Sequence, residues 1–203
     1  MKKKKRKRKI IIFSIILIFL IGITYYFFNK NNNYKEVKVI SNIEGYNYTL
    51  ENNKTALYQD LFYQLKNILE TETVNEEEYA ILISKMFASD FYDLNSKISK
   101  NDIGGLQFIY PDKIDTFVTK AQDTIYAYVN SNIYNNRNQE LPIVSNVEAS
   151  IENNTTFKYD TITDNKAINT VVNITYQKDL KYPSTINLTL IHSDKYLYIA
   201  EIN

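Results

Sequence analysis

The feature that most constrains this chain is a run of eight cations followed at once by nineteen uncharged residues. The cations occupy positions 2–9, and the apolar stretch IIIFSIILIFLIGITYYFF occupies positions 10–28. The stretch contains no proline. As a helix it would be about 28 Å long, which is close to the thickness of the hydrocarbon core of a bilayer. The sequence therefore predicts a transmembrane helix over residues 10–28, in contact with a lipid bilayer.

The cations predict the orientation of this helix, because cationic flanks are retained on the cytoplasmic side of a membrane. Residues 1–9 are predicted to be a cytoplasmic basic tail, residues 29–36 a linker, and residues 37–203 the extracytoplasmic domain of a single-pass plasma-membrane protein. A cleaved signal peptide is one alternative to this signal anchor, but the apolar run ends in TYYFF without a small-residue cleavage site. A buried helix of a soluble protein is another alternative. The tail itself could instead bind nucleic acid or anionic lipid.

The composition narrows the class of partner and of chemistry. The formal net charge is +1, but without the eight cations of the tail there are 16 Lys and Arg against 23 Asp and Glu, so residues 10–203 carry about −7. An acidic domain of this kind is not expected to bind nucleic acid. The absence of cysteine excludes disulfides, thiolate catalysis and cysteine-based metal sites. The abundance of residues encoded by A/T-rich codons (Asn, Lys, Ile and Tyr) indicates a low-GC bacterial source.

Three segments beyond the linker show helical periodicity. In the first, apolar residues recur at three- and four-residue steps over residues 57–69. In the second, an apolar stripe over residues 79–98 follows Asn75, which can cap a helix whose first turn is acidic. In the third, a stripe over residues 117–128 follows Pro111, a residue that favours the start of a helix.

The remaining segments alternate apolar and polar residues, as the strands of an antiparallel sheet do. Strands are expected within residues 37–50 and, as a short one, over residues 106–110. Beyond Pro142 four strands are expected, within residues 147–159, 168–176, 186–192 and 196–202. This order predicts an α+β fold, in which an N-terminal transmembrane helix precedes a roll of about three helices packed on a bent antiparallel sheet.

The order of elements over residues 37–203 resembles the nuclear-transport-factor-2-like or cystatin-like roll, in which a bent sheet wraps around helices. The segments DIGGLQFIYPD (residues 102–112) and DTIY (residues 123–126) resemble a group of uncharacterised single-pass membrane proteins of low-GC Gram-positive bacteria. A membrane anchor before such a roll is also similar to the assembly-factor subunits of type IV secretion and conjugation machines, which act as scaffolds and dimerise. These resemblances imply a scaffold function and assign no site residue.

Residues 102–112 are the most distinctive part of the domain, since they hold two of the four glycines and one of the three prolines. Paired glycines can let a ligand or a partner backbone approach closely. The structural alternative is a tight turn before a short strand, with the proline starting the next helix. The candidate partner-binding residues are Asp102, Gly104, Gly105, Tyr110 and Pro111.

The single histidine, His192, is the best candidate for acid–base chemistry. A carboxylate or phenol beside it could form the pocket of an isomerase or dehydratase. The side chains considered for this role are Asp90, Asp93, Tyr92 and Tyr126. We expect instead that His192 lies at a strand end with no acidic group converging on it.

Metal binding has less support in the sequence. The consecutive glutamates of residues 76–78 would fan around a helix, and the acids at positions 160 and 164 frame a turn too sparse in oxygen ligands for calcium. The sequence therefore predicts no catalytic residue, no cofactor and no metal site.

These patterns together favour a non-enzymatic interaction or scaffold module, anchored in the membrane and acting outside the cytoplasm in a bacterial envelope. Its expected partner is an envelope protein or a second copy of the chain. The alternative is a small-ligand-binding or isomerase- or dehydratase-like domain that uses the cone of the roll.

Overall fold

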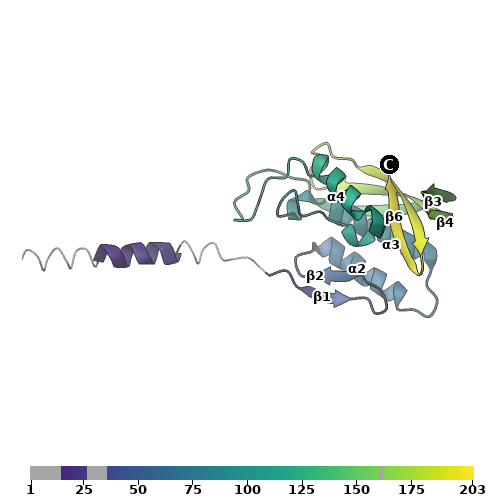
Figure 1. Cartoon of the computed structure of the whole chain (residues 1–203), viewed down its shortest axis with the longest axis horizontal. Helices are drawn as coiled ribbons and strands as arrows, with labels where there is room; N and C mark the ends of the chain where they lie inside the picture. The colour runs from purple at the N-terminus through teal and green to yellow at the C-terminus, as the bar shows by residue number, and fades with distance from the viewer. Residues whose placement is uncertain (1–14, 27–35, 161) are drawn as a thin grey trace, which may run out of the picture. The chain divides into compact units, whose positions relative to one another are not determined.

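The computed structural model describes residues 15–26 and 36–203, with the exception of residue 161. The chain divides into two units, residues 1–36 and Val37–Asn203. In the first unit an exposed helix covers residues 15–26, drawn in purple in Figure 1. The second unit contains all the other helices and strands that the structure describes.

The predicted transmembrane helix over residues 10–28 is contradicted by the structure. The described helix covers twelve residues, about 18 Å at the usual rise, whereas a hydrocarbon core is roughly 30 Å thick. Across residues 15–26 and 36–203 without residue 161, no helix is both long and apolar enough to cross a membrane. This finding contradicts the predicted signal anchor and the single-pass plasma-membrane location. The predicted basic tail and residues 10–14 and 27–35 lie outside the described residues.

The second unit is α+β, with two antiparallel sheets in place of the single bent sheet that was predicted. The smaller sheet pairs β1 (Val39–Asn42) with β2 (Thr49–Glu51). The larger has the strand order β3-β4-β5-β6. Its strands are β3 (Val144–Tyr159), β4 (Ile162–Tyr176), β5 (Thr185–Ser193) and β6 (Tyr196–Ile202). The α-helices of the unit are α2 (Ala56–Leu69), α3 (Glu76–Phe91) and α4 (Ile114–Asp123), and its 3-10 helices are η1 (Leu94–Ser96), η2 (Leu106–Phe108) and η3 (Pro111–Lys113) (Figure 1).

The two longest helices of this unit begin at side-chain caps. Thr55 Oγ1 accepts a hydrogen bond from the Tyr58 N–H at 3.2 Å, where α2 begins. Asn75 Oδ1 accepts hydrogen bonds from the N–H groups of Glu77 and Glu78 at 3.1 and 3.2 Å, where α3 begins. The acidic first turn of α3 lies at the positive end of its dipole. The predicted cap at Asn75 is confirmed.

The core forms around α3, which contacts α2 as well as strands β3 and β4. Most side chains of α3 beyond its first turn are buried, as the apolar stripe predicted. Two polar contacts fix the helix in this interior. Ser84 Oγ forms a hydrogen bond with Thr170 Oγ1 of β4 at 2.8 Å, and the hydroxyl of Tyr79 lies 2.6 Å from that of Tyr48. Both contacts satisfy polar groups that would be costly to bury alone.

Three segments differ from the sequence prediction. The second helix ends at Phe91, whereas the predicted stripe continued to Ile98, and residues 94–96 form the separate 3-10 helix η1. Residues 106–108 form the 3-10 helix η2 and not a strand, because Gly105 adopts a φ of +76° and its carbonyl accepts a hydrogen bond from the Phe108 N–H at 3.0 Å. Only Ile109 pairs with the large sheet, through a single parallel bridge to Ile199. The third helix ends at Asp123, earlier than the stripe to Tyr128 suggested.

Candidate functional site

The candidate functional site is an open groove with a volume of about 1030 Å³. One wall is a single face of α4 and the residues next to it, where lining side chains recur at three- and four-residue steps. These side chains are Lys113, Thr116, Phe117, Lys120, Ala121 and Thr124. The helix therefore presents lysines and hydroxyls along the groove and two apolar side chains among them.

The opposite walls come from both edge strands of the large sheet. Residues 156–159 of β3 and residues 199–203, which include the end of β6, line the groove as consecutive residues. Side chains of a strand alternate between its two faces, so consecutive lining residues show that the strand edges border the groove. Phe91 and Tyr92 at the end of α3, together with Ile109, complete the lining.

The charge of the groove is predominantly positive. Lys113, Lys120 and Lys158 line it, and Glu201 is the one carboxylate side chain among the lining residues. The Lys113 Nζ lies 3.3 Å from the ring centroid of Tyr159, a cation–π contact. Within the described residues, no carboxylate forms an ion pair with any of the three lysines. The groove therefore offers ammonium groups to an anionic ligand such as a carboxylate or a phosphate.

The groove does not contain a recognisable acid–base pair. Burial raises the pKa of the Tyr92 phenol to about 12, so this group stays protonated at neutral pH. In the part of the chain that the structure describes, no hydrogen bond joins Glu201 to a lysine or a tyrosine of the groove. General acid–base catalysis requires such groups within reach of the same reacting atom. The lining is therefore suited to binding more than to proton transfer.

The predicted partner-binding segment lies elsewhere and is mostly internal. Gly104 and Gly105 are buried. A Cβ on Gly105 would lie 2.6 Å from the Phe87 ring, and one on Gly104 would overlap the backbone carbonyl of Asp90. The glycines therefore allow the loop to pack closely on α3. The structural alternative considered for them, a tight turn, agrees with the φ of +76° at Gly105, but a 3-10 helix and not a short strand follows it.

The carboxylate of Asp90 holds this loop in place. Its Oδ2 accepts a hydrogen bond from the Gly105 N–H at 2.8 Å, and its Oδ1 lies 2.6 Å from the Lys97 Nζ. The Lys54 Nζ lies 3.0 Å from Oδ2. Burial alone would raise the pKa of Asp90, but the charges of Lys97 and Lys54 lower it to about 2. Asp90 is thus an ionised structural anchor.

The other three predicted residues are partly or fully exposed. The Asp102 Oδ2 accepts a hydrogen bond from the Ile98 N–H at 2.8 Å, the Tyr110 N–H donates to the carbonyl of Ile199 at 3.0 Å, and Pro111 begins η3. A partner that bound this segment would contact these three and not the glycines. Partner binding through the segment stays a prediction.

His192 has two acidic neighbours, so the expectation of no converging acid is wrong. Its Nδ1 lies 2.8 Å from Asp164 Oδ2 on β4, and its Nε2 lies 2.8 Å from Glu76 Oε1 at the start of α3. The backbone N–H of His192 also donates to Asp164 Oδ2 at 2.8 Å. None of the four acids and tyrosines considered as partners for His192 is among these neighbours. The sequence could not show this cluster, because Glu76 and His192 are 116 residues apart.

The geometry of this cluster makes His192 a poor general base. Both ring nitrogens face carboxylates, and an imidazole can donate to two acceptors only when it is protonated. Burial lowers the pKa of His192, but the hydrogen bonds to Asp164 and Glu76 outweigh this effect, so the net pKa is raised. The ring is not among the residues that line the groove. We interpret the cluster as an ion-pair connection between β4, β5 and α3.

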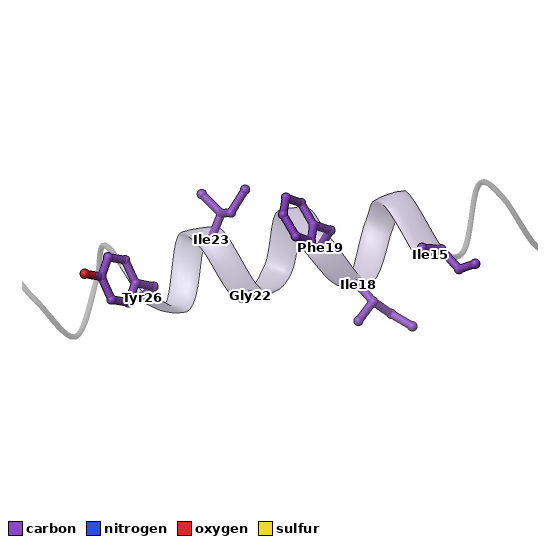
Figure 2. Close-up of a pocket in the computed structure, with 6 residues that line it drawn as sticks. All are labelled: Ile15, Ile18, Phe19, Gly22, Ile23 and Tyr26. Carbon is purple, nitrogen blue, oxygen red and sulfur yellow. The ribbon is translucent and has the colours of Figure 1, made fainter.

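The remaining candidates do not form a site. In the residues that the structure describes, no group of three His, Cys, Asp or Glu side chains is arranged to hold a metal ion. A shallow apolar depression lies along the helix of residues 15–26, but all of its lining residues come from that one helix, and Figure 2 shows Ile18 and Ile23 pointing to opposite sides. A depression of this kind encloses no ligand.

Comparison with known proteins adds no assignment, since no protein-family model, curated protein or solved structure matches the chain. The groove itself was missed at the level of sequence. One signal was present, because Lys113 and Lys120 are seven residues apart and so lie on one face of the predicted third helix. Nothing in the sequence indicated that Lys158 and the two strand edges would join them.

Proposed function

We propose that the second unit is a non-enzymatic interaction module and that its groove receives a partner molecule. The observation that carries this proposal is the set of three lysines that no carboxylate of the described residues neutralises. Cations gathered in one groove repel each other, and of these three only Lys113 has a cation–π or ion-pair contact within the described residues, with the ring of Tyr159. An anionic partner accounts for their placement along two walls of one groove.

The titratable groups outside the groove support binding over catalysis. Asp90 is fully engaged by two lysines and a backbone N–H, and His192 by two carboxylates. Neither group has a free position at which it could take a proton from a substrate. An isomerase- or dehydratase-like activity, the alternative considered from the sequence, needs a free acid or base, whereas Asp90 and His192 are both held in ion pairs.

A small anionic molecule is the second candidate for the groove. The volume of about 1030 Å³ is at the upper end of the range for small-molecule sites. An open shape bordered by the edges of two strands, however, buries a small ligand poorly. These features favour a partner that extends along the groove.

Site-specific photo-crosslinking in producing cells tests the proposal. A photoreactive amino acid at position 116, which lines the groove, should give a discrete adduct that disappears when Lys113, Lys120 and Lys158 are changed to Gln. The matched control is the same amino acid at position 119, an exposed position on α4 that does not line the groove. Adducts of equal yield at both positions, or none at position 116, would contradict a binding role for the groove.

A further inference from the structure

The outer edge of β6 already pairs with one other residue of the chain. Ile109 forms a parallel bridge with Ile199, and the Tyr110 N–H donates to the carbonyl of Ile199 at 3.0 Å. Pro111 then begins η3, so the pairing stops after one bridge. Beyond Ile199 the strand continues into the groove with nothing paired along its outer side in the described residues.

The hydrogen-bond register shows which backbone groups remain open. Asn187 and Asn203 exchange both backbone hydrogen bonds, at 2.8 and 2.9 Å. In an antiparallel pair such residues alternate with non-hydrogen-bonded ones, so the N–H and C=O of Ile202 point away from β5. No backbone partner for these two groups lies within the described chain. An open strand edge is a template for another extended segment.

The side chains around this edge define what such a segment must carry. Lys113, Lys120 and Lys158 favour acidic side chains, and Glu201 is the one carboxylate side chain of the lining that opposes them. Partly buried apolar groups favour aliphatic or aromatic side chains. Those of the lining are Phe117, Ile125, Phe157 and Ile202. Since Phe117 shares one wall with Lys113 and Lys120, the segment must carry acidic and apolar side chains on the side that faces α4.

We propose that the groove binds an extended acidic segment of a partner protein, which also carries apolar residues and which adds as a strand to the outer edge of β6. This inference rests on the proposed function and names the chemistry of the partner. The segment would take up the N–H and C=O of Ile202, place its carboxylates near the three lysines, and bury its apolar side chains between α4 and the sheet.

Selection of random twelve-residue peptides on the immobilised full chain tests this inference. We expect the selected peptides to be enriched in acidic and apolar residues. The triple change of Lys113, Lys120 and Lys158 to Gln should weaken their binding at least roughly tenfold, through loss of three charge-assisted contacts. The matched control is Lys178→Gln with Lys181→Gln, two lysines in exposed ion pairs outside the groove, which should leave binding unchanged.

Two further variants test the strand addition itself. Ile202→Pro removes the outward N–H, which an edge strand tolerates because that group pairs with no neighbour. It should weaken peptide binding roughly tenfold, whereas Ile202→Ala, which keeps the N–H, should weaken it less. Hydrogen exchange of the Ile202 amide should slow when a selected peptide is bound. Equal binding by both variants, or unchanged exchange, overturns strand addition.

The outcomes separate this inference from the function on which it rests. Peptides that require the groove, shown by loss of binding in Thr116→Trp, but that have no acidic bias would overturn the inference and leave the binding module intact. An absence of any groove-dependent peptide would overturn both. Sodium decanoate is the probe for a small amphipathic anion. If it binds saturably and no groove-dependent peptide is found, the groove is assigned to small amphipathic anions instead of a protein segment.

Discussion

The Asp90 cluster, formed by Asp90, Lys97 and Lys54 beside the loop around Gly105, and the groove beside α4 both contain lysines, but only those of the cluster are paired with a carboxylate. In the cluster, the carboxylate of Asp90 lies between the ammonium groups of Lys97 and Lys54 and accepts a hydrogen bond from the Gly105 N–H. In the groove, three lysines have no carboxylate partner among the described residues. The comparison separates charge used to hold the fold from charge available to a partner.

The contrast between paired and unpaired lysines is tested most directly by removing the carboxylate charge of Asp90. Asp90→Asn should lower the free energy of unfolding by about 3–5 kcal/mol, because it leaves the buried ammonium of Lys97 without its counter-charge. Urea denaturation at neutral pH measures the loss. The matched control is Glu140→Gln, which breaks an ion pair whose two side chains are 60% and 63% exposed and should cost less than about 1 kcal/mol. Similar losses in both variants would mean that the Asp90 cluster is not a buried anchor.

The next largest effect on the free energy of unfolding is expected from a substitution at Gly105. Gly105→Ala should cost about 2–4 kcal/mol, since Gly105 has a φ of +76° and a Cβ would lie 2.6 Å from the Phe87 ring. The free energy of unfolding again gives the measurement.

A double-mutant cycle separates these two causes. If the contact with the ring dominates, Phe87→Leu should reduce the cost of Gly105→Ala, whereas a purely conformational penalty would leave that cost unchanged. A cost below about 1 kcal/mol for Gly105→Ala alone would contradict the close packing of the loop on α3.

The sequence predicted the regular elements of the second unit better than its irregular ones. The period of 3.6 residues indicated α2 and α3, the cap at Asn75 was confirmed, and alternation indicated the strands of the large sheet. These signals are local, so they are readable from neighbouring residues. The 3-10 helix after Gly105 was missed, because the turn depends on how closely the loop can pack on α3.

The two polar clusters were missed for a different reason. Asp164 and Glu76 are 28 and 116 residues from His192, and Lys158 comes from strand β3, whereas Lys113 and Lys120 come from η3 and α4. Contacts of that range are set by the pairing of strands and the packing of helices, which one sequence does not show. The predicted transmembrane helix is contradicted for another reason, since no helix of the described residues is long and apolar enough to cross a membrane.

Changes in the histidine cluster should affect the free energy of unfolding less than changes around Gly105 and more than changes in the groove. Two hydrogen-bonded carboxylates outweigh burial and raise the pKa of His192 above its ordinary value of 6.5. A raised pKa means that the folded state holds the proton more tightly, so the contribution to stability is complete below about pH 6.5 and is lost as the pH rises through the folded value. The ring is partly exposed, so the effect should be at most about 1 kcal/mol.

The measurement compares the wild type with His192→Gln in urea at about pH 5.5 and about pH 8.5. The destabilisation by His192→Gln should be larger at the lower pH. Glu76→Gln, which removes the more exposed of the two carboxylates, should show the same trend with a smaller amplitude. A difference that grows with rising pH would show that the neutral ring is the form that the fold prefers.

The smallest effect on stability is expected in the groove, and it is the sharpest test of the comparison. Changing Lys120 and Lys158 to Gln should each alter the free energy of unfolding by less than about 0.5 kcal/mol, because no ion pair is lost. Lys113→Gln should cost less than about 1 kcal/mol, because its cation–π contact is near the surface. Lys54→Gln is the matched control from the Asp90 cluster, since it removes the same charge from a lysine that bonds both oxygens of Asp90, and it should cost about 1–3 kcal/mol. If a groove lysine cost as much as Lys54, its charge would be holding the fold, and the lysines could no longer be assigned to a partner.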